Sequence, residues 1–300
     1  MKIKLAENFR AVFYAPFYAT HALGLFKQEG VEIELIDSPS PGSGIADMLA
    51  GKIDVVWGGP LRVIKQRDQE EDSENALVAF CEVVGKDPFF IVGPTSERAF
   101  QLKDLSGHCL GVVTEVPTPW LCLQQDLRDA GVSIDSITIN ASNTMGENLA
   151  ALQTGEIDYA QYFEPFVSQT IASGAGVVLH AANSRGPTAY TTFISTRKII
   201  TQKQAAFEAM IRAIEKMGPW IQAHTGQELA TVIAPYYPHV SVEILTQAMD
   251  RYKEAGIWFC KQTISRVGFE RLKVSMLNGG FISSNPTYEI CIAQFSQEKL

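Results

Sequence analysis

The sequence lacks any run of about 18 consecutive apolar residues, so it predicts no membrane-spanning helix. Its first residues, MKIKLAENFR, lack the apolar core and small-residue cleavage site of a secretory signal peptide. We expect a cytoplasmic protein if Met1 is the native start, and a periplasmic one if the chain is a trimmed mature form.

An excess of positive charge is also missing, because 25 Lys and Arg stand against 33 Asp and Glu, for a net charge of −8. Nucleic acid and anionic membranes both require a basic face, so this balance disfavours them as partners. The charge alone does not identify a substrate.

Signatures of catalysis and metal binding are absent as well. The five cysteines are widely spaced without a C-x-x-C pair, which favours free thiols over a disulfide framework or a zinc site. The five histidines show no metal-ligand spacing. Nucleophile-elbow, P-loop and dinucleotide motifs do not occur. We therefore expect no metal, no other cofactor and no catalytic residues.

No Gly/Ser-rich linker divides the 300 residues, although this length is sufficient for two domains. Strand and helix patterns alternate up to about residue 196, which predicts α/β architecture with mainly parallel sheets. The rest of the chain is predicted to be mostly helical, with helices near 203–223, 226–234, 241–255 and 265–278.

One segment occurs twice: IADMLAGKIDVVWGGP at 45–60 and LAALQTGEIDYAQYFEP at 149–165. Placing Ile45 on Leu149 aligns Gly51 with Gly155 and Asp54 with Asp158. Each copy reads as a helix, a glycine stop, a strand and a proline-marked turn. A duplicated α/β unit predicts two similar lobes with a cleft between them.

Several further segments carry a family resemblance. They are APFYATH (15–21), GLF (24–26), EGVEIE (29–34), LAGKID (49–54) and DLSG (104–107). Over about residues 1–200 the chain resembles type II periplasmic solute-binding proteins of ABC transporters. The similarity is to the branch that handles thiamin pyrimidine precursors, taurine, alkanesulfonates and nitrate.

The resemblance implies a monomer of two α/β lobes that close on a small-molecule ligand, with an ABC permease as partner. It implies a discontinuous first lobe, residues 1–88 plus 190–300, and a second lobe, residues 89–189. An enzyme of this fold, the eukaryotic pyrimidine precursor synthase, carries a cysteine-rich motif, whereas Cys260 here stands alone in GIWFC. This departure argues against an enzyme.

Ligands of open α/β sheets bind beyond the carboxyl ends of strands, near helix N-termini. Applied to the predicted strands and to the two crossings between lobes, this rule gives the candidate ligand-binding residues: Asn8, Phe9, Arg10, Phe13, Trp57, Gly58, Gly59, Arg62, Glu82, Glu115, Thr118, Trp120, Tyr162, Glu164 and Tyr190.

The candidates are rich in aromatic rings and carboxylates, which suit a planar ligand that bears an amine. This favours a thiamin pyrimidine precursor or a related nitrogen heterocycle. The alternative is a sulfonate or carboxylate, held by Arg10 or by Arg62 beside the helix start at Gly58-Gly59-Pro60.

Several candidates also have a purely structural interpretation. Trp57 would pack in the lobe core, Trp120 would staple its loop to its helix, and Glu164 would cap a helix. Arg10 would pair with Glu7 at the surface.

The expected function is capture of a small molecule for an importer. The alternative is a cytosolic enzyme of the pyrimidine-forming, decarboxylase or dehydratase type, with Glu82, Glu115 or Glu164 as acid or base.

Overall fold

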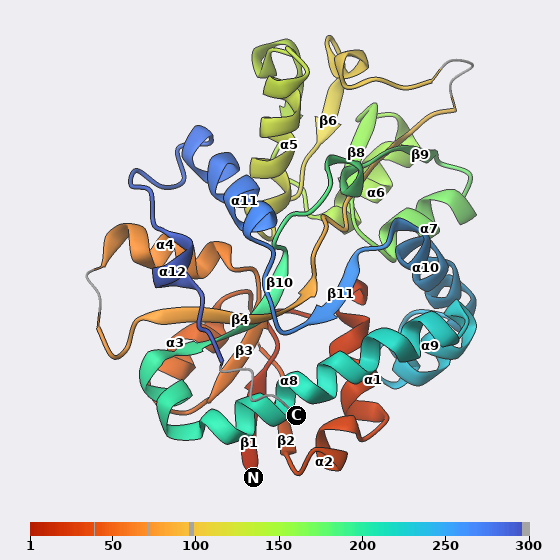
Figure 1. Ribbon diagram of the computed structural model, residues 1–300. Helices are drawn as coiled ribbons and strands as arrows, with labels where there is room; N and C mark the ends of the chain where they lie inside the picture. The colour runs from red at the N-terminus through yellow and green to blue at the C-terminus, as the bar shows by residue number, and fades with distance from the viewer. Residues whose placement is uncertain (39, 71–72, 96–98, 296–300) are drawn as a thin grey trace.

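Strands from distant parts of the sequence assemble into two sheets in the computed structural model, which describes residues 1–38, 40–70, 73–95 and 99–295 (Figure 1). The first sheet has the order β11–β4–β10–β3–β1–β2. Its strands are β1 (Lys2–Ala6), β2 (Glu32–Ile36), β3 (Val55–Gly58), β4 (Leu77–Val84), β10 (Thr191–Thr196) and β11 (Trp258–Lys261).

The second sheet has the order β7–β6–β8–β5–β9. Its strands are β5 (Phe90–Gly93), β6 (Cys109–Gly111), β7 (Thr138–Asn140), β8 (Tyr159–Tyr162) and β9 (Val177–Ala181). In each sheet three strands pair in parallel, β2–β1–β3 and β7–β6–β8. The strands flanking the crossings, β4, β5, β9 and β10, add antiparallel pairs, as does β11. The predicted α/β architecture is therefore present, with mixed rather than uniformly parallel sheets.

Helices cover both sheets and fill the C-terminal part of the chain (Figure 1). The α-helices are α1 (Ala15–Ala22), α2 (Leu25–Gln28), α3 (Ser43–Leu49), α4 (Leu61–Gln69), α5 (Thr118–Asp129), α6 (Met145–Thr154), α7 (Phe166–Ala172), α8 (Arg197–Ala223), α9 (Gly226–Ile233), α10 (Val242–Ala255), α11 (Arg266–Asn278) and α12 (Tyr288–Cys291). Short 3-10 helices span Val12–Tyr14, Leu102–Leu105, Ile134–Ser136, Ala182–Arg185 and Ala234–Tyr236. None of the helices in the described residues is both long enough and apolar enough to cross a membrane.

The repeated segment forms the same structure twice. Each copy supplies a helix, α3 or α6, and a strand inside its sheet, β3 or β8. Gly51 and Gly155 follow these helices with φ of +74° and +76°, a conformation that glycine adopts without steric cost. Asp54 Oδ2 accepts a hydrogen bond from Lys4 N (2.9 Å), and Asp158 Oδ2 accepts the equivalent one from Cys109 N (2.7 Å). The repeated aspartate therefore ties its own strand to the neighbouring parallel strand.

The chain crosses between the sheets twice, through residues 85–89 and 182–190. The two crossings lie side by side, because Thr188 N donates to Gly85 O (2.9 Å), Tyr190 N to Val84 O (3.0 Å) and Ala182 N to Phe89 O (3.0 Å). Both are thus held in one backbone hydrogen-bonded ribbon.

One large apolar core runs through this ribbon and joins both sheets. Phe13, which precedes α1, packs its ring edge-to-face on Phe163, which follows β8, at a centroid distance of 5.3 Å. Phe89 contacts Phe163 at the same centroid distance. These rings form an aromatic seam, Phe13–Phe89–Phe163, between the two halves of the molecule.

Candidate functional site

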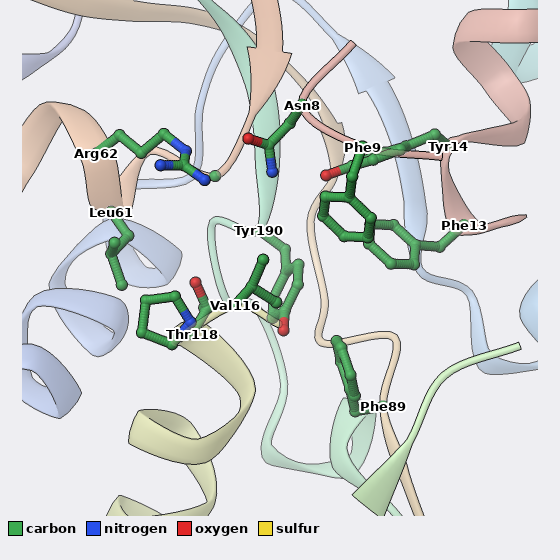
Figure 2. Close-up of a pocket in the computed structure, with 12 residues that line it drawn as sticks. Asn8, Phe9, Phe13, Tyr14, Leu61, Arg62, Phe89, Val116, Thr118 and Tyr190 are labelled. Atoms are coloured by element: carbon green, nitrogen blue, oxygen red, sulfur yellow. The ribbon is translucent and has the colours of Figure 1, made fainter. Parts of the chain in front are cut away.

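A small cavity of about 30 Å³ lies beside the aromatic seam. A cavity of this size holds about two water molecules. Figure 2 shows its walls, which come from both halves of the molecule. The lining residues are Asn8, Phe9, Phe13, Tyr14, Gly59, Leu61, Arg62, Phe89, Val116, Pro117, Thr118 and Tyr190.

Two helix N-termini converge on this cavity. Gly59, Leu61 and Arg62 line it at the start of α4, and Val116, Pro117 and Thr118 line it at the start of α5. Neither helix has a side-chain cap at its N-terminus. The positive ends of two helix dipoles therefore face the same space, an arrangement that favours negative charge.

Arg62 is the charged side chain of the lining. It is half-buried, and burial lowers the pKa of its guanidinium. Within the described part of the chain no hydrogen bond or ion pair engages this side chain. A partly desolvated cation without a counter-ion is costly, so this position is prepared for an anion.

The Asn8 amide has a defined orientation. Gly42 N donates to Asn8 Oδ1 at 3.0 Å, which turns the Nδ2 group toward the interior of the cavity (Figure 2). Burial raises the pKa of the neighbouring Tyr14 phenol, and a hydrogen bond from Asn8 acts in the opposite direction. Asn8 therefore presents a donor rather than an acceptor.

Aromatic rings form the wall opposite Arg62 (Figure 2). Phe9 lies 6.1 Å from Phe13 between ring centroids, and Tyr190 lies 6.2 Å from Phe13 and 6.0 Å from Phe89. The Tyr190 hydroxyl is buried and finds no hydrogen-bond partner in the described residues. Burial also raises its pKa, so it stays protonated as a further donor.

Seven of the residues predicted for ligand binding line the cavity: Asn8, Phe9, Phe13, Gly59, Arg62, Thr118 and Tyr190. Gly58 lies directly behind it, where an added Cβ would be 3.5 Å from Asn8 Cβ. Five lining residues were not among the candidates: Tyr14, Leu61, Phe89, Val116 and Pro117. Leu61, Val116 and Pro117 lie in the same strand-end segments, each next to a predicted candidate: Arg62, Glu115 and Thr118 respectively.

The three predicted carboxylates lie elsewhere. Glu115 accepts hydrogen bonds from Met145 N (2.8 Å) and Thr114 N (3.2 Å), and so caps the start of α6. Glu82, on β4, is fully buried and accepts a hydrogen bond from Ser265 N at 3.2 Å. Burial raises the pKa of Glu82 to about 7.

Glu164 is the third of these carboxylates and is buried completely. It accepts hydrogen bonds from Ser168 N (3.0 Å) and Ser168 Oγ (3.1 Å) at the start of α7, and it pairs with Arg251 of α10. These bonds are those of a helix cap, the structural role suggested for Glu164 by the sequence. Burial raises its pKa, although Arg251 opposes the shift.

The remaining candidates also lie outside the lining. Trp57 is buried and stacks on Phe17 at 4.7 Å between ring centroids, within the core of the first sheet. Trp120 packs against a separate core cluster of the second sheet. Tyr162 is buried on β8, and its hydroxyl has no partner in the described residues.

Arg10 is not among the lining residues, and its side chain pairs with Glu7. Its guanidinium donates to Glu7 Oε1 (2.8 Å), to Asp37 Oδ1 (2.6 Å) and to the Tyr236 carbonyl (2.9 Å). Arg10 therefore forms the ion pair with Glu7 that its structural interpretation predicted, although the Glu7 carboxylate is buried and not at the surface.

Within residues 1–38, 40–70, 73–95 and 99–295, no three His, Cys, Asp or Glu side chains come together to hold a metal ion. The five cysteines are free thiols, and four of them are buried. The cavity therefore offers donors from Arg62, Asn8, Thr118 and Tyr190, and no carboxylate among the described residues that line it.

Comparisons with known proteins place this geometry in context. A family model described as "NMT1/THI5 like" matches residues 12–227. A Bacillus subtilis (strain 168) protein named "Putative binding protein YtlA" is 22% identical over 306 residues, covering 100% of this chain and 90% of that protein.

Solved structures share the architecture. The ligand-binding component of an ABC-type import system from Staphylococcus aureus, with zinc bound, superposes with a TM-score of 0.73 at 16% identity, covering 98% of this chain and 96% of that one. The periplasmic aliphatic sulphonate binding protein SsuA from Escherichia coli gives a TM-score of 0.73 at 15% identity, covering 93% and 91%. At these identities the likeness establishes the fold, and it confirms the predicted periplasmic-binding-protein architecture.

Proposed function

The chain belongs to the NMT1/THI5-like family, and from this premise we propose that it is the substrate-binding component of an ABC importer. The shared fold and the names of its relatives support this proposal. In such a role the protein captures a small molecule and delivers it to a permease. We further propose that the mature protein works on the periplasmic side as a monomer.

We propose that the ligand carries an anionic group, a sulfonate, carboxylate or phosphate. The observation that carries this proposal is Arg62, a half-buried cation without a partner in the described residues. The helix N-termini of α4 and α5 and the donors of Asn8 and Thr118 surround the same space. Each of these groups stabilises negative charge.

Apart from its anionic group, the proposed ligand is planar or apolar. Phe9, Phe13, Phe89 and Tyr190 offer ring faces and edges, which suit a flat body. A heterocycle that bears an acidic group could contact the aromatic wall with its ring and Arg62 with its anionic group. The preference for an amine-bearing ligand depended on Glu82, Glu115 and Glu164, and the cavity lining includes none of them.

A ligand of this kind needs more room than about 30 Å³, so the walls must separate to admit it. The division into lobes at 1–88 plus 190–300 and 89–189 supplies the motion. It is supported by the assignment of strands to the two sheets and by the paired crossings. The ligand would then enter an open cleft and be enclosed on closure.

The proposal excludes an enzyme. A catalytic acid or base must reach the bound molecule, and the carboxylates suggested for that role lie outside the cavity lining. The relative and the solved structures named above are described as binding proteins or components.

A ligand screen tests the proposal. Benzenesulfonate, benzoate and phenyl phosphate would be compared with benzamide and benzylamine by thermal shift and then by calorimetry. A ligand at a hundredfold excess over its Kd stabilises the fold by about 2.7 kcal/mol, so we expect Tm to rise by roughly 5 °C for at least one anion. Stabilisation by benzylamine alone would overturn the anionic ligand, and flat curves with all five compounds would contradict a binding cavity for such molecules.

A further inference from the structure

Gly42 lies next to two polar side chains that line the cavity, Asn8 after β1 and Arg62 at the start of α4. It immediately precedes α3 and has φ of +89°, a left-handed conformation that favours glycine. Its N–H donates to Asn8 Oδ1, and its Cα faces the guanidinium of Arg62. One residue outside the cavity lining therefore touches Asn8 and Arg62 together.

The contact with Asn8 determines which end of the amide faces the ligand. Because Gly42 supplies a donor, the amide oxygen must face it. The Nδ2 group is then left for the cavity, as Figure 2 shows. Without this hydrogen bond the amide could turn and present an acceptor, which would repel an anion.

The contact with Arg62 depends on the missing side chain of glycine. A Cβ at position 42 would lie 2.8 Å from Arg62 Nη1 and 3.4 Å from Arg62 Cζ. The distance to Nη1 is shorter than a normal van der Waals contact, so one of the two groups would have to move. The flexible guanidinium would move rather than the backbone. In the described part of the chain no hydrogen bond holds Arg62, so the space above Gly42 determines where its charge lies.

We propose that Gly42 is a positioning residue that sets the charge selectivity of the cavity. This inference rests on the proposed function, since it takes the ligand to be anionic. Gly42 fixes an amide donor and seats a guanidinium so that both point at one anionic group. Any L-residue at this position would displace the guanidinium and leave the apolar walls unchanged.

The experiment compares Gly42→Ala with Gly51→Ala. Both glycines flank α3 and have positive φ, and a Cβ at Gly51 would meet no atom within 4 Å. The two variants therefore share the backbone strain and differ in the contact with Arg62. Calorimetry with benzenesulfonate and with neutral benzenesulfonamide measures charge selectivity as the ratio of the two Kd values.

We expect Gly42→Ala to weaken benzenesulfonate binding about tenfold or more, the loss of one charge-assisted contact. Benzenesulfonamide should bind within about twofold of the wild type, because its ring contacts remain. Gly51→Ala should keep the wild-type ratio of the two Kd values, although its Tm falls as in Gly42→Ala.

Asn8→Asp provides a second variant. It keeps an acceptor for Gly42 N–H and places a carboxylate oxygen where the amide donor was. Benzenesulfonate affinity should fall and benzylamine affinity should rise.

The outcomes separate this inference from the proposed function. If Gly42→Ala and Gly51→Ala give the same ratio of the benzenesulfonate and benzenesulfonamide Kd values, the inference is wrong, while binding of benzenesulfonate by the wild type still supports the proposed function. If the wild type binds none of the anions, the proposed function and this inference both fail.

Discussion

Arg62 is the residue on which the proposed anion binding depends. It lies at the start of α4, faces aromatic walls, and has no anionic partner in the described residues. A neutral side chain of similar length would keep the packing and remove the charge. The importance of that charge can therefore be measured separately.

Arg62→Gln is predicted to weaken binding of the anionic probe by about tenfold to a hundredfold, since one charge-assisted hydrogen bond contributes about 1.5–3 kcal/mol. The unfolding free energy should rise or stay level, because a half-buried cation is removed. Calorimetry and urea unfolding measure the two effects.

Arg128→Gln is the matched control, because Arg128 is exposed on α5 and contacts only Gln124 of its own helix among the described residues. It makes the same change in net charge. Equal losses of affinity in both variants would show that overall charge, and not Arg62, attracts the anion.

Glu82 makes stability depend on pH. Burial raises the pKa of Glu82 to about 7 from its ordinary value of 4.5, so the folded protein binds this proton more tightly than the unfolded chain does. The contribution of Glu82 to the unfolding free energy is therefore greatest below about pH 4.5 and decreases as pH rises toward 7. The full cost at higher pH is at most roughly 3 kcal/mol.

Glu82→Gln is predicted to raise the unfolding free energy by about 1–3 kcal/mol at pH 8 and to change it little at pH 5. Urea unfolding at both pH values measures this difference. Glu254→Gln, at an exposed position, serves as control. A stabilisation of the same size at pH 5 and pH 8 would contradict the ionisation argument.

Residues of the cavity lining were predictable where the local sequence decides their position. Asn8, Gly59, Arg62 and Thr118 follow strands, and the strand-end rule predicts that such residues lie close together, as they do in the cavity lining. The carboxylates were not predictable in this way, because their partners are distant in sequence. Glu164 meets Arg251, and Glu82 meets Ser265.

At the scale of elements, the repeated aspartate joins neighbouring strands in the same way in both sheets. Asp158 accepts from Cys109 N, and Asp158 N donates to Cys109 O at 2.9 Å. Asp54 forms the same pair of bonds with Lys4. The duplicated sequence therefore encodes the alignment of a strand and not only its presence.

Asp158→Ala is predicted to lower the unfolding free energy by about 1–2 kcal/mol, because Cys109 N loses its side-chain acceptor. Urea unfolding measures the loss. Glu156→Ala, two residues earlier and exposed, should cost less than about 0.5 kcal/mol. If the two variants lose the same stability, the aspartate has no special role in strand alignment.

Most helices and strands were predictable, because the apolar residues of their segments recur with the spacing of a helix or a strand. The helices expected near 226–234, 241–255 and 265–278 correspond to α9, α10 and α11. β11 was missed, because the four residues WFCK between two helices are too short to show a strand period. It forms because β4 offers it an edge.

At the scale of the molecule, Arg251 and Glu164 join the C-terminal helices to the second sheet. Arg251 lies on α10, while Glu164 lies between β8 and α7 and is fully buried. Arg251 Nη1 also meets Ser168 Oγ at 2.8 Å. The contact would have to open if the lobes separate as proposed.

Arg251→Gln is predicted to favour the open form, because the buried Glu164 loses its counter-charge. The radius of gyration measured by X-ray scattering without ligand should increase, and the affinity for the anionic probe should fall about threefold to tenfold. Arg212→Gln breaks the Arg212–Glu29 pair between α8 and the turn after α2, within the first proposed lobe, and is the control. Identical scattering from the two variants would mean that this contact does not hold the closed form.

The paired crossings have one last consequence, which concerns how such a protein changes during evolution. Thr188 and Tyr190 bond to Gly85 and Val84. The segment between the two crossings, which carries the second sheet, therefore leaves and rejoins the rest of the chain at nearly one point. A different insert could begin and end there without rerouting the remaining backbone. Phe89, Val116 and Thr118 belong to the insert, whereas Asn8 and Arg62 do not. One wall of the cavity, which includes the start of α5, could therefore be exchanged as a unit while Asn8 and Arg62 are inherited unchanged.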